Sequence, residues 1–193
     1  MGHLALSDLG RTFAGRRVLV TGHTGFKGSW LSLWLADLGA VVTGYALAPR
    51  SPQDHFVEAG VGRLITHVES DIRDAARLSA VVRDTQPEFV FHLAAQAIVS
   101  ESYADPKATF DVNVGGTVNL LEAVRETPSV RALVCITSDK CYRNQEWVWG
   151  YRENDALGGR DPYSASKAAA ELAFAAWQAS FFESRPGLAA ATA

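Results

Sequence analysis

Short apolar runs alternate along this chain with longer segments in which apolar residues recur every three or four positions. Five of the short runs are rich in Val, Leu, Ile and Phe, and they predict buried β-strands. These runs are residues 16–22 (RRVLVTG), 40–47 (AVVTGYAL), 63–71 (RLITHVESD), 88–95 (EFVFHLAA) and 131–137 (RALVCIT). The final residues, GLAAATA, predict a sixth strand that begins near residue 188.

Helical periodicity fills the intervals between these strands. Asp74 predicts an N-cap, and the pairs Asp105-Pro106 and Asp161-Pro162 predict two more helix starts, because Asp favours the N-cap and Pro the first helical position. The last helix is Ala-rich and runs to about Phe182. The apolar faces expected for the first three helices are Leu31, Trp34, Leu35 and Leu38 (stopped by Gly39), then Leu78, Val81 and Val82, then Phe110, Val114, Thr117, Leu121 and Val124.

Alternation of apolar strands with helices predicts an α/β fold with a doubly wound parallel sheet of the Rossmann type, covered on both faces. We expect one domain over residues 1–193, with residues 1–15 as an N-terminal extension. Ligands of such sheets bind beyond the carboxyl ends of the strands. The strand ends place four residues on this edge: Gly22, Asp71, Ala94 and Ser138.

Composition narrows the functional classes. Hydrophobic residues make up 48% and charged residues 20% of the chain, which is typical of a globular domain. The net charge of −3 argues against a nucleic-acid surface, and no apolar run of 18 residues offers a membrane span. The N-terminus lacks a continuous signal-peptide core, so we expect a cytoplasmic protein. With Cys135 and Cys141 alone, neither a disulfide framework nor a metal site is indicated.

A glycine loop follows the first strand and opens the first helix. TGHTGFKG carries Gly22, Gly25 and Gly28, which let the backbone turn tightly and approach a pyrophosphate at the helix N-terminus. His23 and Lys27 lie in the loop, and each is expected either to touch phosphate or to be solvated. The acid that usually binds the adenosine ribose is missing from the end of the second strand, where Arg50 follows instead. NAD and NADP therefore both remain open from residue chemistry.

A tyrosine and a lysine lie four residues apart near the start of the last helix. In YSASK this spacing puts Tyr163 and Lys167 on one face, and the ammonium favours a phenolate that is usable as a base near neutral pH. The hydroxyl of Ser138, beside Tyr163, is expected to share a hydrogen bond with a substrate oxygen. Abstraction of a hydroxyl proton while a nicotinamide removes the carbon-bound hydride is alcohol oxidation.

These motifs together resemble the extended short-chain dehydrogenase/reductases that act on nucleotide sugars, and more narrowly the CDP-glucose 4,6-dehydratase family. The resemblance runs from about Arg16 to Phe182. The stretches that carry it are VLVTGHTGFKGSWLSLWL, DIRD, FHLAAQ, NVGGTVNLLEAVR, TSDKCYRNQEWVWGYRENDALGG and DPYSASK.

The resemblance implies an NAD site and a nucleotide-sugar substrate. It places Tyr163 as the base, Lys167 on the nicotinamide ribose, Asp71 and Ile72 beside adenine, and Gln96 and Ser138 in contact with substrate. The cofactor-binding residues that it implies are Gly22, His23, Thr24, Gly25, Phe26, Lys27, Gly28, Asp71, Ile72, Leu93, Ala94, Ala95, Gln96, Tyr163 and Lys167.

The implied reaction oxidises sugar C4, removes water across C5 and C6, and returns the hydride to C6. Asp139 is then the acid for the departing 6-hydroxyl, and Lys140 the base for the C5 hydrogen. Asp139 must stay protonated through burial or a negative neighbour, and Lys140 must be neutral through desolvation and a nearby cation. A solvated strand end is the alternative reading of this pair.

Three expectations concern the rest of the protein. The family's chains are longer and carry a C-terminal substrate domain, which is missing here, so this piece alone should turn over little or nothing. The helices starting at Asp105 and Asp161 are expected to form a homodimer. Alternative functions are a nucleotide-sugar epimerase and a non-catalytic dinucleotide-binding module. The aromatic block at Trp147 and Trp149 is either part of a substrate lid or local packing.

Overall fold

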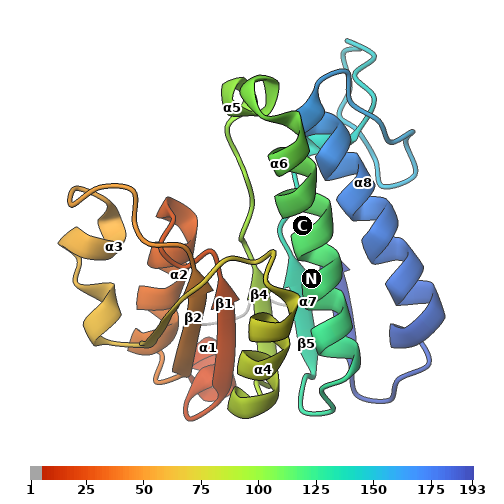
Figure 1. Cartoon of the computed structure of the whole chain (residues 1–193). Helices are drawn as coiled ribbons and strands as arrows, with labels where there is room; N and C mark the ends of the chain where they lie inside the picture. Colours follow the sequence, from red (N-terminus) through yellow and green to blue (C-terminus); the bar gives the residue numbers. More distant parts are fainter. Residues whose placement is uncertain (1–5) are drawn as a thin grey trace.

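The structure is a computed structural model that describes residues 6–193 (Figure 1). Its centre is one six-stranded sheet in the order β3-β2-β1-β4-β5-β6, and every neighbouring pair is parallel. The doubly wound sheet and the sixth strand are therefore confirmed. The strands are β1 (Arg17–Thr21), β2 (Val41–Ala46), β3 (Thr66–Glu69), β4 (Phe89–His92), β5 (Ala132–Cys135) and β6 (Ala189–Thr192).

One helix precedes the first strand, and the others lie between or after the strands, on both sides of the sheet. The helices are α1 (Leu6–Phe13), α2 (Phe26–Asp37), α3 (His55–Glu58), α4 (Ala75–Thr85), α5 (Val99–Ala104), α6 (Pro106–Phe110), α7 (Gly116–Arg125) and α8 (Pro162–Trp177). Short 3₁₀ turns cover Val61–Arg63 and Asp139–Cys141, and π-helical segments cover Asp111–Gly115 and Gln178–Phe182. Within residues 6–193, none of the helices has the length and apolar character that crossing a membrane requires.

The three predicted aspartate caps are confirmed. The side chain of Asp74 accepts a hydrogen bond from the backbone N–H of Arg77, and Asp105 and Asp161 each cap their helix in the same way. These bonds satisfy amides that have no intrahelical partner, so they define where α4, α6 and α8 begin.

Two local predictions were incomplete. The helix expected from Asp105 is interrupted by the π-helical segment Asp111–Gly115, and Phe110 on its expected apolar face is 38% exposed. Trp34, on the expected inner face of α2, is 46% exposed, whereas small residues of α2 are buried. Small side chains let α2 approach the sheet closely, and this moves the tryptophan to the edge of the contact.

The N-terminal extension contributes to the fold from residue 6 onward. Its helix α1 ends at Phe13, whose ring lies 5.1 Å from that of Phe89 and 6.4 Å from that of Phe91 on β4. Residues 1–5 lie outside the described part of the chain.

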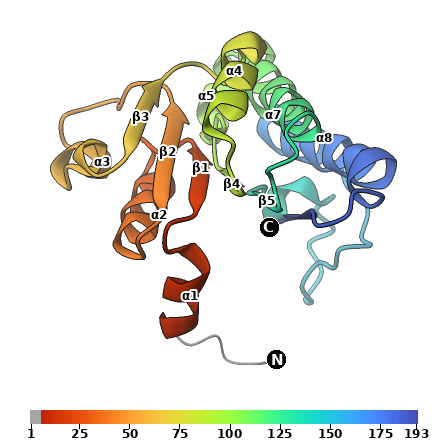
Figure 2. The ribbon, with the colours of Figure 1, turned by 90° about the horizontal axis from the view of Figure 1, so that it is seen from below.

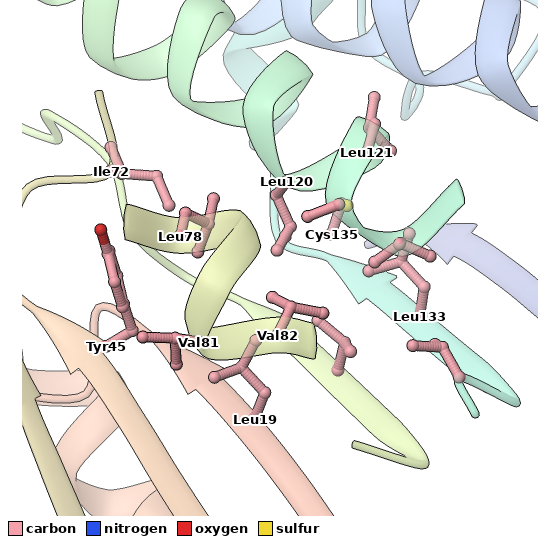
Figure 3. Close-up of a cluster of buried hydrophobic side chains, with 14 of the residues drawn as sticks. Leu19, Tyr45, Ile72, Leu78, Val81, Val82, Leu120, Leu121, Leu133 and Cys135 are labelled. Carbon is pink, nitrogen blue, oxygen red and sulfur yellow. The ribbon is translucent and has the colours of Figure 1, made fainter. Parts of the chain in front are cut away.

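Side chains of the strands alternate between two apolar clusters. Leu19 belongs to the larger cluster under α4, α7 and α8, whereas Val18 and Val20 belong to a smaller one with α2. Figure 2 shows α4, α7 and α8 on one side of the sheet and α2 on the other. Figure 3 shows the larger cluster, in which Leu78 and Val82 of α4 meet Leu120 of α7 above the sheet. Alternate burial on two faces is the pattern expected of a parallel sheet.

Arg185 fixes the segment that joins α7 to β5 through side-chain hydrogen bonds. Its guanidinium donates to the carbonyls of Val124 at 2.8 Å, Thr127 at 2.6 Å and Val130 at 3.2 Å. These carbonyls lie at and after the end of α7, and those of Val124 and Thr127 also accept the backbone N–H groups of Thr127 and Val130. Desolvation lowers the pKa of Arg185 below its usual value.

Candidate active site

The glycine loop turns directly from β1 into α2. Gly22 has a φ of +75°, and a Cβ there would lie 2.7 Å from the backbone of Ala94. A Cβ on Gly28 would lie 2.2 Å from the carbonyl oxygen of Gly22, so both positions require glycine. Gly25 is the N-cap of α2, and no side chain caps this end. The first amides of α2 and its positive dipole end therefore suit a pyrophosphate.

His23 is fully buried, which excludes the solvated one of its two expected roles. Its Nε2 lies 2.6 Å from Nδ1 of His67 on β3, and its ring fills the space beside Gly44, where a Cβ would come within 2.3 Å of it. Desolvation first, and then the charge of His67, lowers the pKa of His23 to about 4. His67 is thereby a specific partner of the glycine loop.

The other loop side chains differ in exposure. Phe26 is 74% exposed and Lys27 is exposed, so both are available to a ligand. Thr24 is buried, and its hydroxyl donates to the carbonyl of Leu47 at 2.9 Å. This bond fixes the chain that leaves β2 against the glycine loop.

Tyr163 and Lys167 are both buried in the first turns of α8. Asp161 accepts hydrogen bonds from the backbone N–H and the hydroxyl of Ser164, which fixes the start of this helix. Lys167 Nζ donates to the carbonyl of Ile136, just after β5, at 3.5 Å. Desolvation lowers the pKa of Lys167, while the nearby carboxylate of Glu171 acts in the opposite direction.

Ser138, Asp139 and Lys140 follow β5 at the 3₁₀ turn that packs against α8. The Ser138 hydroxyl donates to Asp139 Oδ1 at 3.1 Å and accepts the backbone N–H of Lys140 at 3.2 Å. Asp139 and Lys140 are exposed. The pair therefore follows the carboxyl end of β5 as predicted, but it lacks the burial that an acid and a base would need.

A second side chain of α8 ties down the end of β5. Thr137 donates from its hydroxyl to Glu171 Oε1 at 2.5 Å, and its backbone N–H donates to the carbonyl of Ala193 at 2.8 Å. Glu171 lies one turn beyond Lys167, so both side chains reach the segment that carries Ser138. Sequence reasoning missed this tether.

The loop after β4 is held by Asn113, which lies in the π-helical segment. Asn113 Oδ1 accepts the N–H of Gln96, while its Nδ2 donates to the carbonyl of Gln96 and to the hydroxyl of Ser166 on α8. The Gln96 side chain is itself bonded to the backbone of Ile98. Gln96 therefore shapes the loop, and a contact with substrate would require it to exchange these bonds.

His92 links this loop to the glycine loop from inside the core. The Thr117 hydroxyl donates to the carbonyl of Asn113, so His92 Nε2–H must be the donor in its 3.0 Å bond to Thr117. The Thr21 hydroxyl then donates to His92 Nδ1 at 2.7 Å and accepts the N–H of Ala94. Desolvation first, and then the charge of Lys167, lowers the pKa of His92 to about 3. The network requires a neutral imidazole.

The remaining predicted cofactor residues lie on the same edge of the sheet. Leu93, Ala94 and Ala95 are half-buried after β4. Asp71 follows β3 and pairs with Arg73 at 2.6 Å, a bond that lowers the pKa of the Asp71 carboxyl. Ile72 is buried and belongs to the core cluster, so its side chain packs inward.

The aromatic block forms a stack beside the 3₁₀ turn. Tyr142 stacks on Tyr151 with ring centroids 5.4 Å apart, and Trp147 contacts both Tyr151 and Trp149. Trp149 is 57% exposed. The predicted local packing is confirmed, and a role in a lid stays a prediction.

Between residues 6 and 193, no cluster of His, Cys, Asp or Glu is suited to a metal ion, and Cys135 and Cys141 are free thiols. Burial raises the pKa of Cys135 to about 12 and that of Cys141 to about 11, so neither is a reactive thiolate near neutral pH.

Together these features line the carboxyl edge of the sheet, with a phosphate-binding turn on β1 and a Tyr–Lys pair beside the end of β5. Figure 1 shows α5 and the start of α8 at this same end of the sheet. The uncapped α2 and the glycine loop fit a dinucleotide.

Comparison with known proteins agrees with this geometry. The family model described as GDP-mannose 4,6 dehydratase matches residues 19–183. CDP-glucose 4,6-dehydratase of Salmonella typhimurium is 53% identical over 168 residues, which cover 87% of this chain and 47% of that protein. dTDP-glucose 4,6-dehydratase of Mycolicibacterium smegmatis is 35% identical, covering 86% and 50%.

Solved structures of relatives share the fold. UDP-glucose 4-epimerase from Brucella ovis, in complex with NAD, superposes with a TM-score of 0.77 at 31% identity, covering 92% of this chain and 51% of that one. The UDP-glucose 4-epimerase of Thermus thermophilus, also in complex with NAD, gives 0.75 at 30%, covering 91% and 53%. The chain spans about half the length of the relatives that it matches. It belongs to the GDP-mannose 4,6 dehydratase family, in the nucleotide-sugar branch of the extended short-chain dehydrogenase/reductases.

Proposed function

We propose that this chain is the cofactor-binding part of an NAD-dependent CDP-glucose 4,6-dehydratase. The observation that carries the proposal is the 53% identity to the Salmonella typhimurium enzyme of that name. The position of Ser138, Asp139 and Lys140 beside α8 supports it, because they follow β5 on the edge of the sheet where ligands of such folds bind.

In the proposed first step the phenolate of Tyr163 takes the proton of the 4-hydroxyl, and Ser138 hydrogen-bonds the same oxygen. Lys167 keeps Tyr163 in place and holds the nicotinamide ribose. NAD would accept the hydride from C4 and return it later to C6. The resulting 4-ketone acidifies the hydrogen on C5, which prepares the elimination.

Asp139 and Lys140 are proposed to carry out the dehydration. Lys140 takes the C5 proton as a neutral amine, and Asp139 gives a proton to the 6-hydroxyl, which leaves as water. Hydride addition at C6 and proton return to C5 then complete the 4-keto-6-deoxy product. Both side chains are exposed among the described residues, so we propose that substrate and a substrate-binding region cover them during the reaction.

The test uses full-length protein with NAD and CDP-glucose. Formation of CDP-4-keto-6-deoxyglucose, detected by its absorbance in base and by mass, is the expected result. A reversible 4-epimer of unchanged mass would contradict the dehydratase and favour an epimerase, the alternative that the solved UDP-glucose 4-epimerases support. Binding of NAD without turnover of any nucleotide sugar would favour the non-catalytic module.

Two properties of the whole protein remain proposals. Residues 105–125 and α8 lie side by side on one face of the domain, and we propose that they form a homodimer with a second copy (Figure 2). Light scattering on the full-length protein tests this, and a monomeric mass at micromolar concentration would contradict it. A cytoplasmic location is proposed from the sequence alone.

A further inference from the structure

We propose that Glu101 restrains Arg50 so that the dinucleotide site discriminates against a phosphorylated adenosine ribose, and hence against NADP. The inference rests on the dinucleotide site of the proposed function, but not on the dehydration chemistry.

Arg50 lies where the adenosine ribose of a dinucleotide is usually recognised. It is 22 positions beyond Gly28, in the segment that leaves β2, and an Asp or Glu about 20 residues beyond the glycine motif usually binds the 2′-hydroxyl. No acid occupies this segment before Asp54. The hydroxyl of Thr24 holds the carbonyl of Leu47, so the segment runs beside the glycine loop.

The backbone of Arg50 is fixed from its other side. Asp54 Oδ2 accepts the backbone N–H groups of Arg50 at 2.7 Å and Ser51 at 3.2 Å, and its Oδ1 accepts the Ser51 hydroxyl. The backbone of Arg50 is therefore held in place, while its side chain can exchange one hydrogen-bond partner for another.

Glu101 comes from the opposite side of the glycine loop. It lies in α5, which is reached from β4, and β1 lies between β2 and β4 in the sheet. The Gln96 side chain bonds both backbone groups of Ile98, the residue that precedes α5, which sets where the helix begins. The two loops that flank the glycine loop are thus joined by one ion pair.

The ion pair is bidentate and uses both terminal nitrogens of the Arg50 guanidinium. Arg50 Nη1 lies 3.1 Å from Glu101 Oε1, and Nη2 lies 3.3 Å from Oε2. A guanidinium uses the same two donors for a carboxylate as for a phosphate, so Glu101 competes directly with a 2′-phosphate for Arg50. Its own negative charge also repels the phosphate, whereas the uncharged 2′-hydroxyl of NAD meets neither obstacle.

The expected effect is modest because both side chains are exposed, at 72% for Arg50 and 47% for Glu101. Exposed pairs are worth up to about 1 kcal/mol, which corresponds to about a fivefold change in affinity. Salt screens such charges, so the effect should shrink as ionic strength rises.

The experiment measures NAD⁺ and NADP⁺ dissociation constants by calorimetry on full-length wild type, Glu101→Gln, Arg50→Gln and the double variant. Glu101→Gln should tighten NADP⁺ binding about fivefold and change NAD⁺ binding less than about twofold. The double variant should lose this gain, because the freed guanidinium is what receives the phosphate. Glu126→Gln, which removes a negative charge on the end of α7 away from this edge, is the matched control and should leave both constants unchanged.

Two results would overturn the inference. One is unchanged NADP⁺ affinity in Glu101→Gln, and the other is an equal gain in the double variant, which would mean that Arg50 takes no part. Because binding is measured without a sugar, failure of the dehydratase assay leaves this test intact. Failure of all four proteins to bind either nucleotide would overturn both the inference and the proposed cofactor site.

Discussion

Acid should destabilise this domain through the buried imidazole of His92. The folded state needs the neutral form, because His92 Nδ1 must accept from the hydroxyl of Thr21, and burial lowers its pKa from 6.5 to about 3. A histidine held neutral gives its full stabilisation above the unfolded pKa of 6.5. It loses that stabilisation steadily as the pH falls toward 3.

The magnitude follows from the gap between the two pKa values. Each pH unit below 6.5 costs about 1.4 kcal/mol while the folded imidazole stays neutral. Going from about pH 7.5 to about pH 5 should therefore remove about 2 kcal/mol through His92. His23, with a pKa of about 4, should remove a similar amount over the same range. The wild-type chain should thus lose about 4 kcal/mol from these two residues.

Urea unfolding across this pH range, followed by circular dichroism, measures the loss. The His92→Gln variant keeps an amide donor and acceptor but cannot take up a proton, so about half of the pH-dependent loss should disappear even if the variant is less stable overall. His55→Gln, on the short helix α3, is the matched control, because it replaces a histidine outside this network. A His92→Gln curve parallel to wild type would refute the assignment of the network.

Three further outcomes are expected. Asp139→Asn in the full-length enzyme should spare C4 oxidation, seen as transient NADH absorbance with CDP-glucose, and block water loss; an unchanged dehydration rate would remove Asp139 from its role. Thr137→Val should lower kcat about tenfold with little change in KM, since it removes the side-chain bond that holds the segment carrying the proposed catalytic groups, while Thr137→Ser should restore kcat; equal activity of the two variants would contradict the tether to Glu171. Arg185→Ala should lower the free energy of unfolding in urea by about 2 kcal/mol, because it removes three hydrogen bonds from a charged donor to carbonyls of buried residues, and a loss below about 0.5 kcal/mol would contradict this.

The strands and helix starts could be predicted from the sequence because their signals are local. An apolar run such as RVLVT or FVFH identifies a strand on its own, and Asp161-Pro162 identifies a helix start. The candidate site followed from the same signals, because a parallel sheet brings all of its strand ends to one edge. The placement of Gly22 and Ser138 on one edge could therefore be predicted without knowledge of their contacts, although they lie more than a hundred residues apart in the sequence.

The polar interior could not be predicted in this way. His92 looks in sequence like any polar residue in a strand, and its partners Thr21 and Thr117 lie 71 and 25 positions away. Solvation was one of the two roles expected for His23, yet Gly44 in the next strand leaves room for its ring inside the fold. Such bonds depend on which side chains the folded strands bring together, and no spacing rule encodes that.

The π-helical segment Asp111–Gly115 amounts to one extra residue inserted into an otherwise continuous helix. Deleting that residue would turn α6 by about 100° relative to α7, because each helical residue advances by that angle. Asn113 would then swing away from Gln96 and Ser166 while the apolar face of α7 stayed buried. This segment should therefore accept replacement of residues other than Asn113 more readily than a change in length, so gaps should be far rarer here than replacements among homologous sequences.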